Sequence, residues 1–310
     1  MNKLKIGILG ANSFIGKSLT EKFINDNDFS ELHLFARNLN TLHNEKGVYE
    51  HPFNLNSDSN LFPISLLEID ILYYLISDSI PASSWNAPCN ELQNNLIPFI
   101  QLIEKLKDGN LKKIIFTSSA GTVYGTSDKK ISENSKTVPF SPHGITKLTT
   151  EYFLEYFKVK YNIQHEVYRI SNIYGPGQNT SKGLGLINTL LEKMIRKEEI
   201  NIYGNGTNTR NYIYIEDVTK ILKLAVRNDI KISTTINLAS SYHFSINEII
   251  ATIEEISLSK LCYTKLSARS SDNPIILIDN SNLKSLYPEF IETPIQIGIK
   301  ETLIYLKKIK

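Results

Sequence analysis

The sequence predicts an α/β protein built on a doubly wound parallel sheet, with a smaller C-terminal α/β lobe. Two patterns support this prediction. Short apolar runs alternate with longer helical patterns over the first half of the chain, and turn residues follow each run. Short, continuously apolar runs are typical of strands buried on both faces. Their alternation with helices is typical of a parallel sheet that helices cover on both sides.

Five apolar runs are the predicted strands. They are KIGILG (5–10), ELHLFAR (31–37), DILYYLIS (70–77), KKIIFTSS (112–119) and HEVYRIS (165–171). Helical patterns lie at residues 17–25, 91–106 and 147–161. Later in the chain, a strand near 235–239 could rejoin the sheet, and a further helix is predicted at 245–256. The third helix should begin earlier, because Ser141 is a good N-cap and Pro142 suits the first helical position. Ligands of such sheets bind at the carboxyl ends of the strands, where we expect the site.

Composition excludes several classes of function. The 310 residues carry 34 Lys and Arg against 32 Asp and Glu, so no global field favours nucleic acid or an anionic membrane. The two cysteines, Cys89 and Cys262, give neither a disulfide framework nor the spacing of a metal site. No run has the length of a membrane span or the pattern of a signal peptide. We therefore expect a cytoplasmic protein with no bound metal.

The first predicted strand leads into a glycine-rich turn, GANSFIG, and then into a helix. Gly10 permits a tight turn, Gly16 permits close packing of helix on strand, and the helix N-terminus offers N–H groups to a diphosphate. This context predicts a Rossmann-type dinucleotide site. Ser13 stands where a second glycine is usual. The expected cofactor contacts in this turn are Gly10, Asn12, Ser13, Phe14, Ile15 and Gly16.

The second predicted strand ends with Arg37, where an acidic residue would accept a hydrogen bond from the ribose of NAD. A guanidinium at this position suits the 2′-phosphate of NADP. NADP is therefore the expected cofactor, and NAD stays open. A solvated surface arginine is the alternative explanation.

Taken together, the motifs resemble those of the extended short-chain dehydrogenases/reductases, of the NAD-dependent epimerase/dehydratase type. The resemblance covers almost the whole chain. The motifs are GANSFIG, Asn54-Leu55, Asn95, SSAGTVYG (118–125), SPHGITK (141–147), RISNIYGPGQ (169–178), IYGNGTNTRNYIYIEDV (202–218), and Arg269 with Asp272. Members of this family mostly act on sugars linked to a nucleoside diphosphate.

The resemblance assigns further roles. Asn54 and Leu55 would contact the cofactor, Asn172 the diphosphate region of the substrate, and Arg210 and Arg269 its phosphates, which suits guanidinium chemistry. It implies a dinucleotide-binding domain at 1–172 plus 211–239 and a substrate domain at 173–210 plus 240–310. It also implies a homodimer that pairs the long helix at 91–106 with the helix after His143.

The family's catalytic set is a Ser or Thr, a Tyr, and a Lys four residues after the Tyr. Lys147 is present, but His143 occupies the tyrosine position and Ala120 the hydroxyl position. Ser119 and Thr122 flank Ala120, and either can supply the hydroxyl. The lysine charge and the helix N-terminus both favour a neutral His143. A catalytic and a purely structural histidine both remain open.

The reaction types of the family can be partly sorted. Dehydratases carry Asp-Glu where this loop has Gly121-Thr122, and enzymes that epimerise beside the ketone carry a Cys at the position of Thr122. We therefore expect hydride transfer at a sugar carbon. Arg37 favours an NADPH-dependent reductase of a nucleotide-linked 4-keto-6-deoxyhexose, as in O-antigen and other surface-polysaccharide synthesis. The alternatives are a nucleotide-sugar 4-epimerase and a non-catalytic NAD(P)-binding sensor or subunit.

Overall fold

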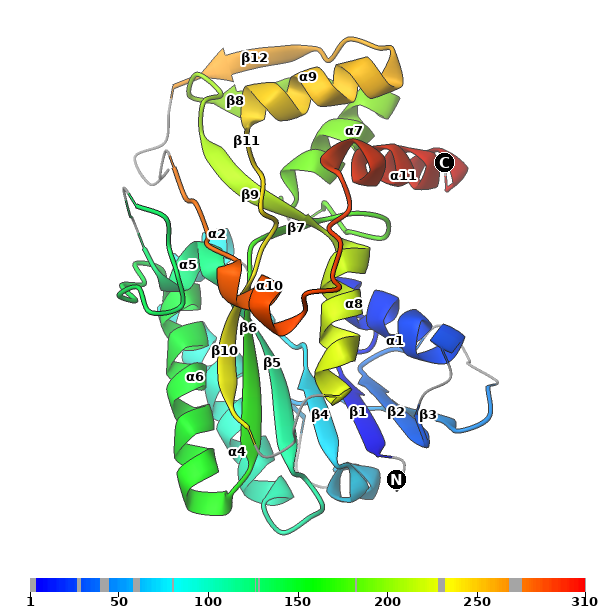
Figure 1. The fold of residues 1–310 in the computed structure, drawn as a ribbon, viewed down its shortest axis with the longest axis vertical. Helices are drawn as coiled ribbons and strands as arrows, with labels where there is room; N and C mark the ends of the chain where they lie inside the picture. The colour runs from blue at the N-terminus through cyan, green and yellow to red at the C-terminus, as the bar shows by residue number, and fades with distance from the viewer. Residues whose placement is uncertain are drawn as a thin grey trace. The chain divides into compact units, whose positions relative to one another are not determined.

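The computed structural model describes residues 4–26, 29–39, 45–57, 62–79, 81–125, 127, 129–181, 183–227, 232–267 and 275–309 (Figure 1). It confirms the predicted fold class. One seven-stranded sheet has the order β10-β6-β5-β4-β1-β2-β3, and its pairs β1–β2, β1–β4, β2–β3 and β4–β5 are parallel. Because β1 lies between β4 and β2, the loops that follow these three strands are neighbours at one edge of the sheet.

The five predicted strands and the strand near 235–239 are all confirmed. One further strand, β3, was not predicted. It lies at the edge of the sheet, and its residues are only partly buried or exposed, so it has no continuous apolar run. The strands are β1 (Lys5–Leu9), β2 (Glu31–Ala36), β3 (Val48–Pro52), β4 (Ile71–Tyr74), β5 (Lys113–Ser119), β6 (Gln164–Ile170) and β10 (Thr234–Leu238).

Two adjacent tyrosines of β4 show which helices cover which face. The ring of Tyr74 packs 4.9 Å from that of Phe99, in α4 (Ile97–Leu106). The Tyr73 hydroxyl donates to the carbonyl of Leu222, in α8 (Ile215–Leu224), at 2.7 Å, and its ring contacts Phe23 of α1 (Phe14–Asp26). Successive side chains of a strand point to opposite faces, so helices cover both sides of the sheet.

The helix that follows the predicted Ser141-Pro142 start is α6 (Pro142–Tyr161). Ser141 caps it as expected, since its hydroxyl accepts the Gly144 N–H at 3.1 Å. α6 covers the same face of the sheet as α4, and Leu154 and Phe157 join the core with Phe99.

The predicted helix at 91–106 is composite. It consists of α3 (Pro88–Glu91), the π-helical turn η3 (Leu92–Leu96) and α4. Its apolar residues do not form a continuous exposed stripe, because Leu96, Phe99, Ile103 and Leu106 are buried in the core, whereas Leu92 and Ile97 are exposed. The periodicity of this helix therefore reflects core burial and gives no support to the predicted dimer.

The chain divides into two compact units, each made of separate segments. Unit 1 consists of Met1–Val123, Thr137–Arg169 and Thr219–Ile236, and unit 2 of Tyr124–Lys136, Ile170–Val218 and Asn237–Lys310. This division differs from the predicted domains chiefly at 124–136 and 211–218, which belong to unit 2. The assignment of one domain to the cofactor and one to the substrate stays a prediction.

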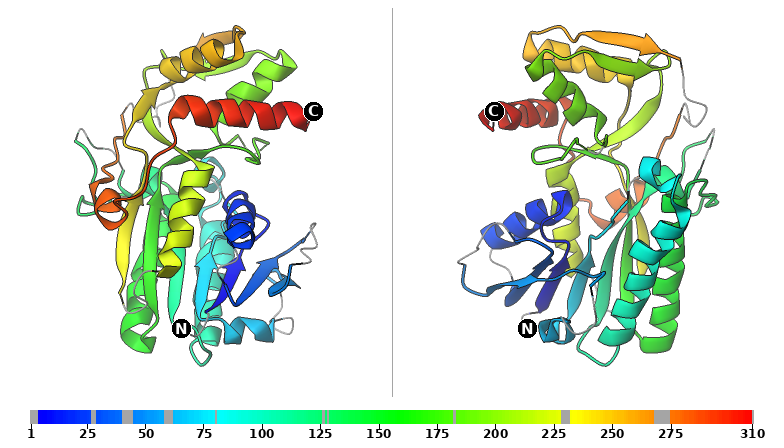
Figure 2. Two further views of the ribbon diagram at one scale, coloured as in Figure 1. Left: turned by 45° about the vertical axis from the view of Figure 1, so that its right-hand side comes forward. Right: turned by 180° about the vertical axis from the view of Figure 1, so that it is seen from behind.

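Unit 2 contains two small sheets and a group of helices. β7 (Asn172–Tyr174), β9 (Thr209–Tyr214) and β11 (His243–Ser245) form one sheet, and β8 (Ile200–Tyr203) pairs with β12 (Tyr263–Leu266). α9, coloured gold in Figure 2, packs against the red α11. The predicted helix at 245–256 is α9, which begins with a Ser245–Glu248 capping box. The helices are α7 (Leu186–Arg196), α9 (Ile246–Ser257), α10 (Ser281–Leu286) and α11 (Ile295–Lys308).

Two absences hold for the described ranges of the chain. No cluster of three or more His, Cys, Asp or Glu side chains is arranged to hold a metal ion. No helix in these ranges combines the length and apolar character needed to cross a membrane.

Candidate active site

The glycine-rich turn after β1 has the geometry of a diphosphate cradle. Gly10 has a φ of +95°, a backbone conformation that glycine adopts without strain. A Cβ on Gly16 would lie 2.2 Å from the Gly10 carbonyl oxygen, so a side chain there is excluded. Ser13 caps α1, with its hydroxyl accepting the Gly16 N–H at 3.0 Å. Glycine at position 16 therefore lets α1 pack closely on β1. This close packing is what a dinucleotide-binding turn requires.

The loops after β1 and β2 are joined at this edge. The Asn12 amide donates to the Asn38 carbonyl at 2.7 Å. Arg37 follows β2, has a side chain 65% exposed, and lies 3.4 Å from Asp78, which follows β4. Because β1 lies between these two strands, Arg37 and Asp78 flank the Gly10 turn. The guanidinium is therefore beside the expected cofactor site, and the one ion pair it forms with described residues, to Asp78, is weak.

Asn54 and Leu55 follow the edge strand β3. Asn54 is exposed, and its side chain accepts the Asn56 N–H at 3.3 Å. Leu55 packs on the core and lines an open pocket together with aromatic side chains and α4. The lining residues are Phe53, Leu55, Ser57, Phe62, Pro98, Gln101, Leu102 and Lys105.

His143 lies in the first turn of α6 and is only 7% exposed. Its Nδ1 is 3.1 Å from the Ser79 hydroxyl, and its backbone N–H donates to the Ser84 hydroxyl at 3.3 Å. Burial, and to a smaller extent the nearby Lys147 charge, lower the pKa of His143 to about 3. The imidazole is neutral, as predicted, but burial rather than the lysine is the larger cause.

Lys147 lies one turn further along α6. Its ammonium donates to the Thr117 carbonyl at 2.9 Å and lies 4.8 Å from the centre of the Phe116 ring, so β5 fixes its position. Burial lowers the pKa of Lys147 to about 8, while the negative charges of Glu91 and Glu151 oppose this shift. This ammonium therefore titrates much closer to neutrality than an ordinary lysine does.

Ser119 and Thr122 stand on either side of Ala120, where β5 passes into α5 (Ala120–Val123). Thr122 donates weakly to the Ser119 carbonyl at 3.5 Å. The backbone of α5 packs tightly on α6, since a Cβ on Gly144 would lie 2.5 Å from the Thr122 carbonyl oxygen. The structure therefore places Thr122 against the start of α6.

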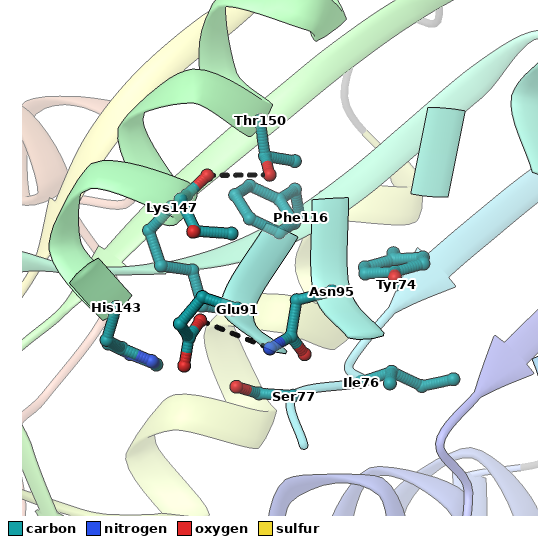
Figure 3. Close-up of a pocket in the computed structure, with 10 residues that line it drawn as sticks. Tyr74, Ile76, Ser77, Glu91, Asn95, Phe116, His143, Lys147 and Thr150 are labelled. Carbon is teal, nitrogen blue, oxygen red and sulfur yellow. Dashed lines mark hydrogen bonds between the residues drawn. The ribbon is translucent and has the colours of Figure 1, made fainter. Parts of the chain in front are cut away.

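His143 and Lys147 line one small cavity together with Glu91, a residue that the motifs did not indicate (Figure 3). Glu91 is 3% exposed and accepts a hydrogen bond from Asn95, one turn later, at 3.1 Å. Ser119 and Thr122 are not among the lining residues. These are Tyr74, Ile76, Ser77, Glu91, Asn95, Phe116, His143, Thr146, Lys147 and Thr150.

The expected substrate residues lie in unit 2. Asn172 begins β7, and its side chain donates to the Asn211 carbonyl of the neighbouring β9 at 3.4 Å. Arg210 is in β9, opposite Phe244 of β11. Because β7, β9 and β11 form one sheet, Asn172 and Arg210 belong to the same sheet. Arg269 and Asp272 lie outside the described residues.

The sequence profile of the NAD dependent epimerase/dehydratase family matches residues 6–239. The chain belongs to this family. This chain is 26% identical to YtcB, an uncharacterized UDP-glucose epimerase of Bacillus subtilis, with 99% of each chain covered. It is 29% identical to the dTDP-4-dehydro-6-deoxyglucose reductase of Escherichia coli over 62% of this chain and 60% of that protein.

Solved structures agree with this assignment of the fold. The UDP-N-acetylglucosamine 4-epimerase of Methanobrevibacter ruminantium covers the full length of the family member with a TM-score of 0.89 at 23% identity. The UDP-glucose 4-epimerase of Thermotoga maritima, solved with UDP-glucose, gives a TM-score of 0.84 at 25% identity over 99% of each chain.

Proposed function

We propose that this protein is an NADPH-dependent reductase of a nucleoside-diphosphate-linked 4-keto-6-deoxyhexose, of the kind consumed in surface-polysaccharide synthesis. The observation that carries the proposal is Arg37, an exposed guanidinium beside the glycine turn. A 2′-phosphate would give this guanidinium a better partner than Asp78. NADPH is consumed at each turnover of a reductase, whereas an epimerase recycles one bound cofactor.

Several residues fit the role of holding the cofactor. The amides at the start of α1 would hold the diphosphate, Arg37 the 2′-phosphate, and Lys147 the ribose beside the nicotinamide. Asn54 and Leu55 would be further cofactor contacts. When bound, the cofactor supplies the hydride. The substrate diphosphate would be held by Asn172, Arg210 and Arg269.

The acid–base groups of the site favour reduction over epimerisation. With a pKa of about 3, only about one His143 ring in 10⁴ is charged at pH 7, so the imidazole can relay a proton or donate a hydrogen bond but is not a reservoir of acid. Ser119 or Thr122 would polarise the ketone. Reduction needs only one proton, which goes to the new alkoxide, and water can replace the proton that the donor has lost. Epimerisation needs one group to act first as a base and then as an acid.

The relatives give support to both reactions. The Escherichia coli relative is a reductase of a 4-keto-6-deoxy sugar nucleotide. YtcB and the Thermotoga maritima enzyme are named as UDP-glucose epimerases, so UDP-sugar 4-epimerisation is the second candidate.

One set of assays separates the candidates. Purified protein is mixed with NADPH and dTDP- or GDP-linked 4-keto-6-deoxyhexoses, and separately with UDP-glucose and NAD. We expect oxidation of NADPH in proportion to the keto sugar consumed. Conversion of UDP-glucose to UDP-galactose without net use of cofactor would instead establish the epimerase. Tight NADPH binding without either reaction would identify a sensor or subunit.

A further inference from the structure

Glu91 is a buried carboxylate whose two oxygens have different surroundings. Oε2 accepts a hydrogen bond from the Asn95 amide at 3.1 Å, whereas Oε1 has no hydrogen-bond partner in the described part of the chain. Asn95 is itself fixed, because its Oδ1 accepts the Asp78 N–H at 2.8 Å. A buried carboxylate oxygen without a partner is unfavourable. Its persistence here indicates that Glu91 has a partner or a task during turnover.

The side chain faces the cavity that His143 and Lys147 line (Figure 3). Two carboxylates influence Lys147, Glu91 from α3 and Glu151 from α6 itself. Glu151 is already engaged, since it forms an ion pair with Arg169 at 2.6 Å and accepts a hydrogen bond from Ser118 at 2.6 Å. Of the two carboxylates, Glu91 is therefore the one with an oxygen, Oε1, that is available to Lys147.

The other groups around Lys147 cannot take over this role. His143, on α6, is neutral, and burial raises the pKa of Tyr74, on β4, further above its ordinary value. From β5, Lys147 meets only the Thr117 carbonyl and the Phe116 ring.

We propose that Lys147 donates the proton in place of the family's tyrosine, and that Glu91 is the positioning residue that keeps Lys147 charged. The proposal rests on the proposed reductase activity. As the hydride reaches the carbonyl carbon, the π electron pair moves onto oxygen. An N–H bond of the Lys147 ammonium breaks, and the O–H bond of the product alcohol forms. The neutral amine then regains a proton from water, and Glu91 is unchanged.

The pH profile of kcat tests this role. An ammonium donor is lost as the pH rises through its pKa, so wild-type kcat should fall above a pH of about 8. Glu91→Gln keeps the size of the side chain and removes the charge that raises the pKa of Lys147. The fall should then begin at a pH lower by about one unit, with KM values for both substrates changed less than about twofold.

Two variants serve as controls. Glu91→Asp keeps the charge and should restore the wild-type profile. Glu155→Gln, an exposed site on α6, changes the net charge equally and should leave the profile unmoved. A kcat that Glu91→Gln lowers by the same factor at every pH would overturn the proposal, because a merely structural residue acts in that way.

A second measurement does not depend on turnover. The rate at which a small amine-acylating reagent labels Lys147, followed by peptide mass spectrometry, reports the pKa of Lys147 in wild type and in Glu91→Gln. A lower midpoint in the variant is expected, and a common midpoint would overturn the role of Glu91. If wild type reduces no keto sugar, the proposed function fails, while the labelling still decides whether Glu91 controls Lys147.

Discussion

Replacing Arg37 by alanine should weaken the binding of NADPH and leave the binding of NADH nearly unchanged. The side chain is 65% exposed and its pair with Asp78, at 3.4 Å, is a surface ion pair worth about 0–1 kcal/mol. Folding should therefore be little affected. The substitution isolates the interaction of one guanidinium with the 2′-phosphate.

The magnitude follows from the two partners of Arg37. Hydrogen bonds between charged groups contribute about 1.5–3 kcal/mol, and loss of the Asp78 pair on binding subtracts up to about 1 kcal/mol. The net of about 0.5–3 kcal/mol corresponds to about 2–150-fold weaker NADPH binding in Arg37→Ala. Asp78→Asn should act in the opposite direction and strengthen NADPH binding about twofold to fivefold, because the guanidinium no longer has a competing carboxylate.

Calorimetric titration of each protein with NADPH and with NADH, at one fixed ionic strength, measures these differences. Higher salt should reduce the preference for NADPH, since the contact is exposed. Equal affinity of the wild type for both cofactors would refute the argument from Arg37, and with it the main reason to place reduction above epimerisation.

Three further predictions concern other parts of the molecule. His143→Phe should lower kcat without changing cofactor affinity, whereas Lys147→Ala should impair both; equal turnover by His143→Phe would show that the proton does not pass through the imidazole. Glu166→Gln should destabilise the fold by about 3 kcal/mol or more in urea unfolding, because it removes the carboxylate 2.7 Å from the buried Lys113 ammonium. The protein should be a homodimer in light scattering, and Val159→Glu, at an exposed position of α6, should make it a monomer; a monomeric wild type would contradict this.

The resemblance pairs two helices in the expected dimer, the helix at 91–106 and α6, and the two differ in their exposed apolar surface. Most apolar residues of the helix at 91–106 are core residues, and only Leu92 and Ile97 among its large apolar side chains are exposed. α6 instead exposes Ile145, Tyr152, Tyr156 and Val159, which are spaced along its length. An exposed apolar stripe of this kind is a common feature of an interface between helices.

The sequence predicted those elements whose signals are local or whose burial is complete. β1, β4 and β5 are buried along nearly their whole length, so each reads as a continuous apolar run. The start of α6 was predictable because an N-cap serine and a following proline act within one turn. β3 was missed because it is too polar to form an apolar run. Such polarity is tolerated at the edge of a sheet, but the sequence does not show which segment lies at the edge.

The site was predictable where a motif fixed the backbone and unpredictable where burial decided the chemistry. The Gly10–Gly16 turn needs only its own residues to form. Glu91 gave no comparable signal, since a glutamate in a helix is ordinarily solvated. Its burial depends on how α3 packs against α6, which is a tertiary property. The same reason explains why burial, rather than its lysine neighbour, has the larger effect on His143.

Because His143 stands where the family has a tyrosine, a different group of this site is suited to act as the acid. Beside a tyrosine, an ammonium lowers a phenol pKa of about 10 towards neutrality. Beside a histidine, the same ammonium lowers a pKa that is already below neutrality, and burial carries it to about 3. Lys147, with a pKa of about 8, is then the group of this pair closest to working pH. Below that pH it is an acid and suits reduction; only near that pH could it also serve as the base that epimerisation requires. Epimerase activity, if it were measured, should therefore peak near pH 8, whereas reductase activity should be greatest below it.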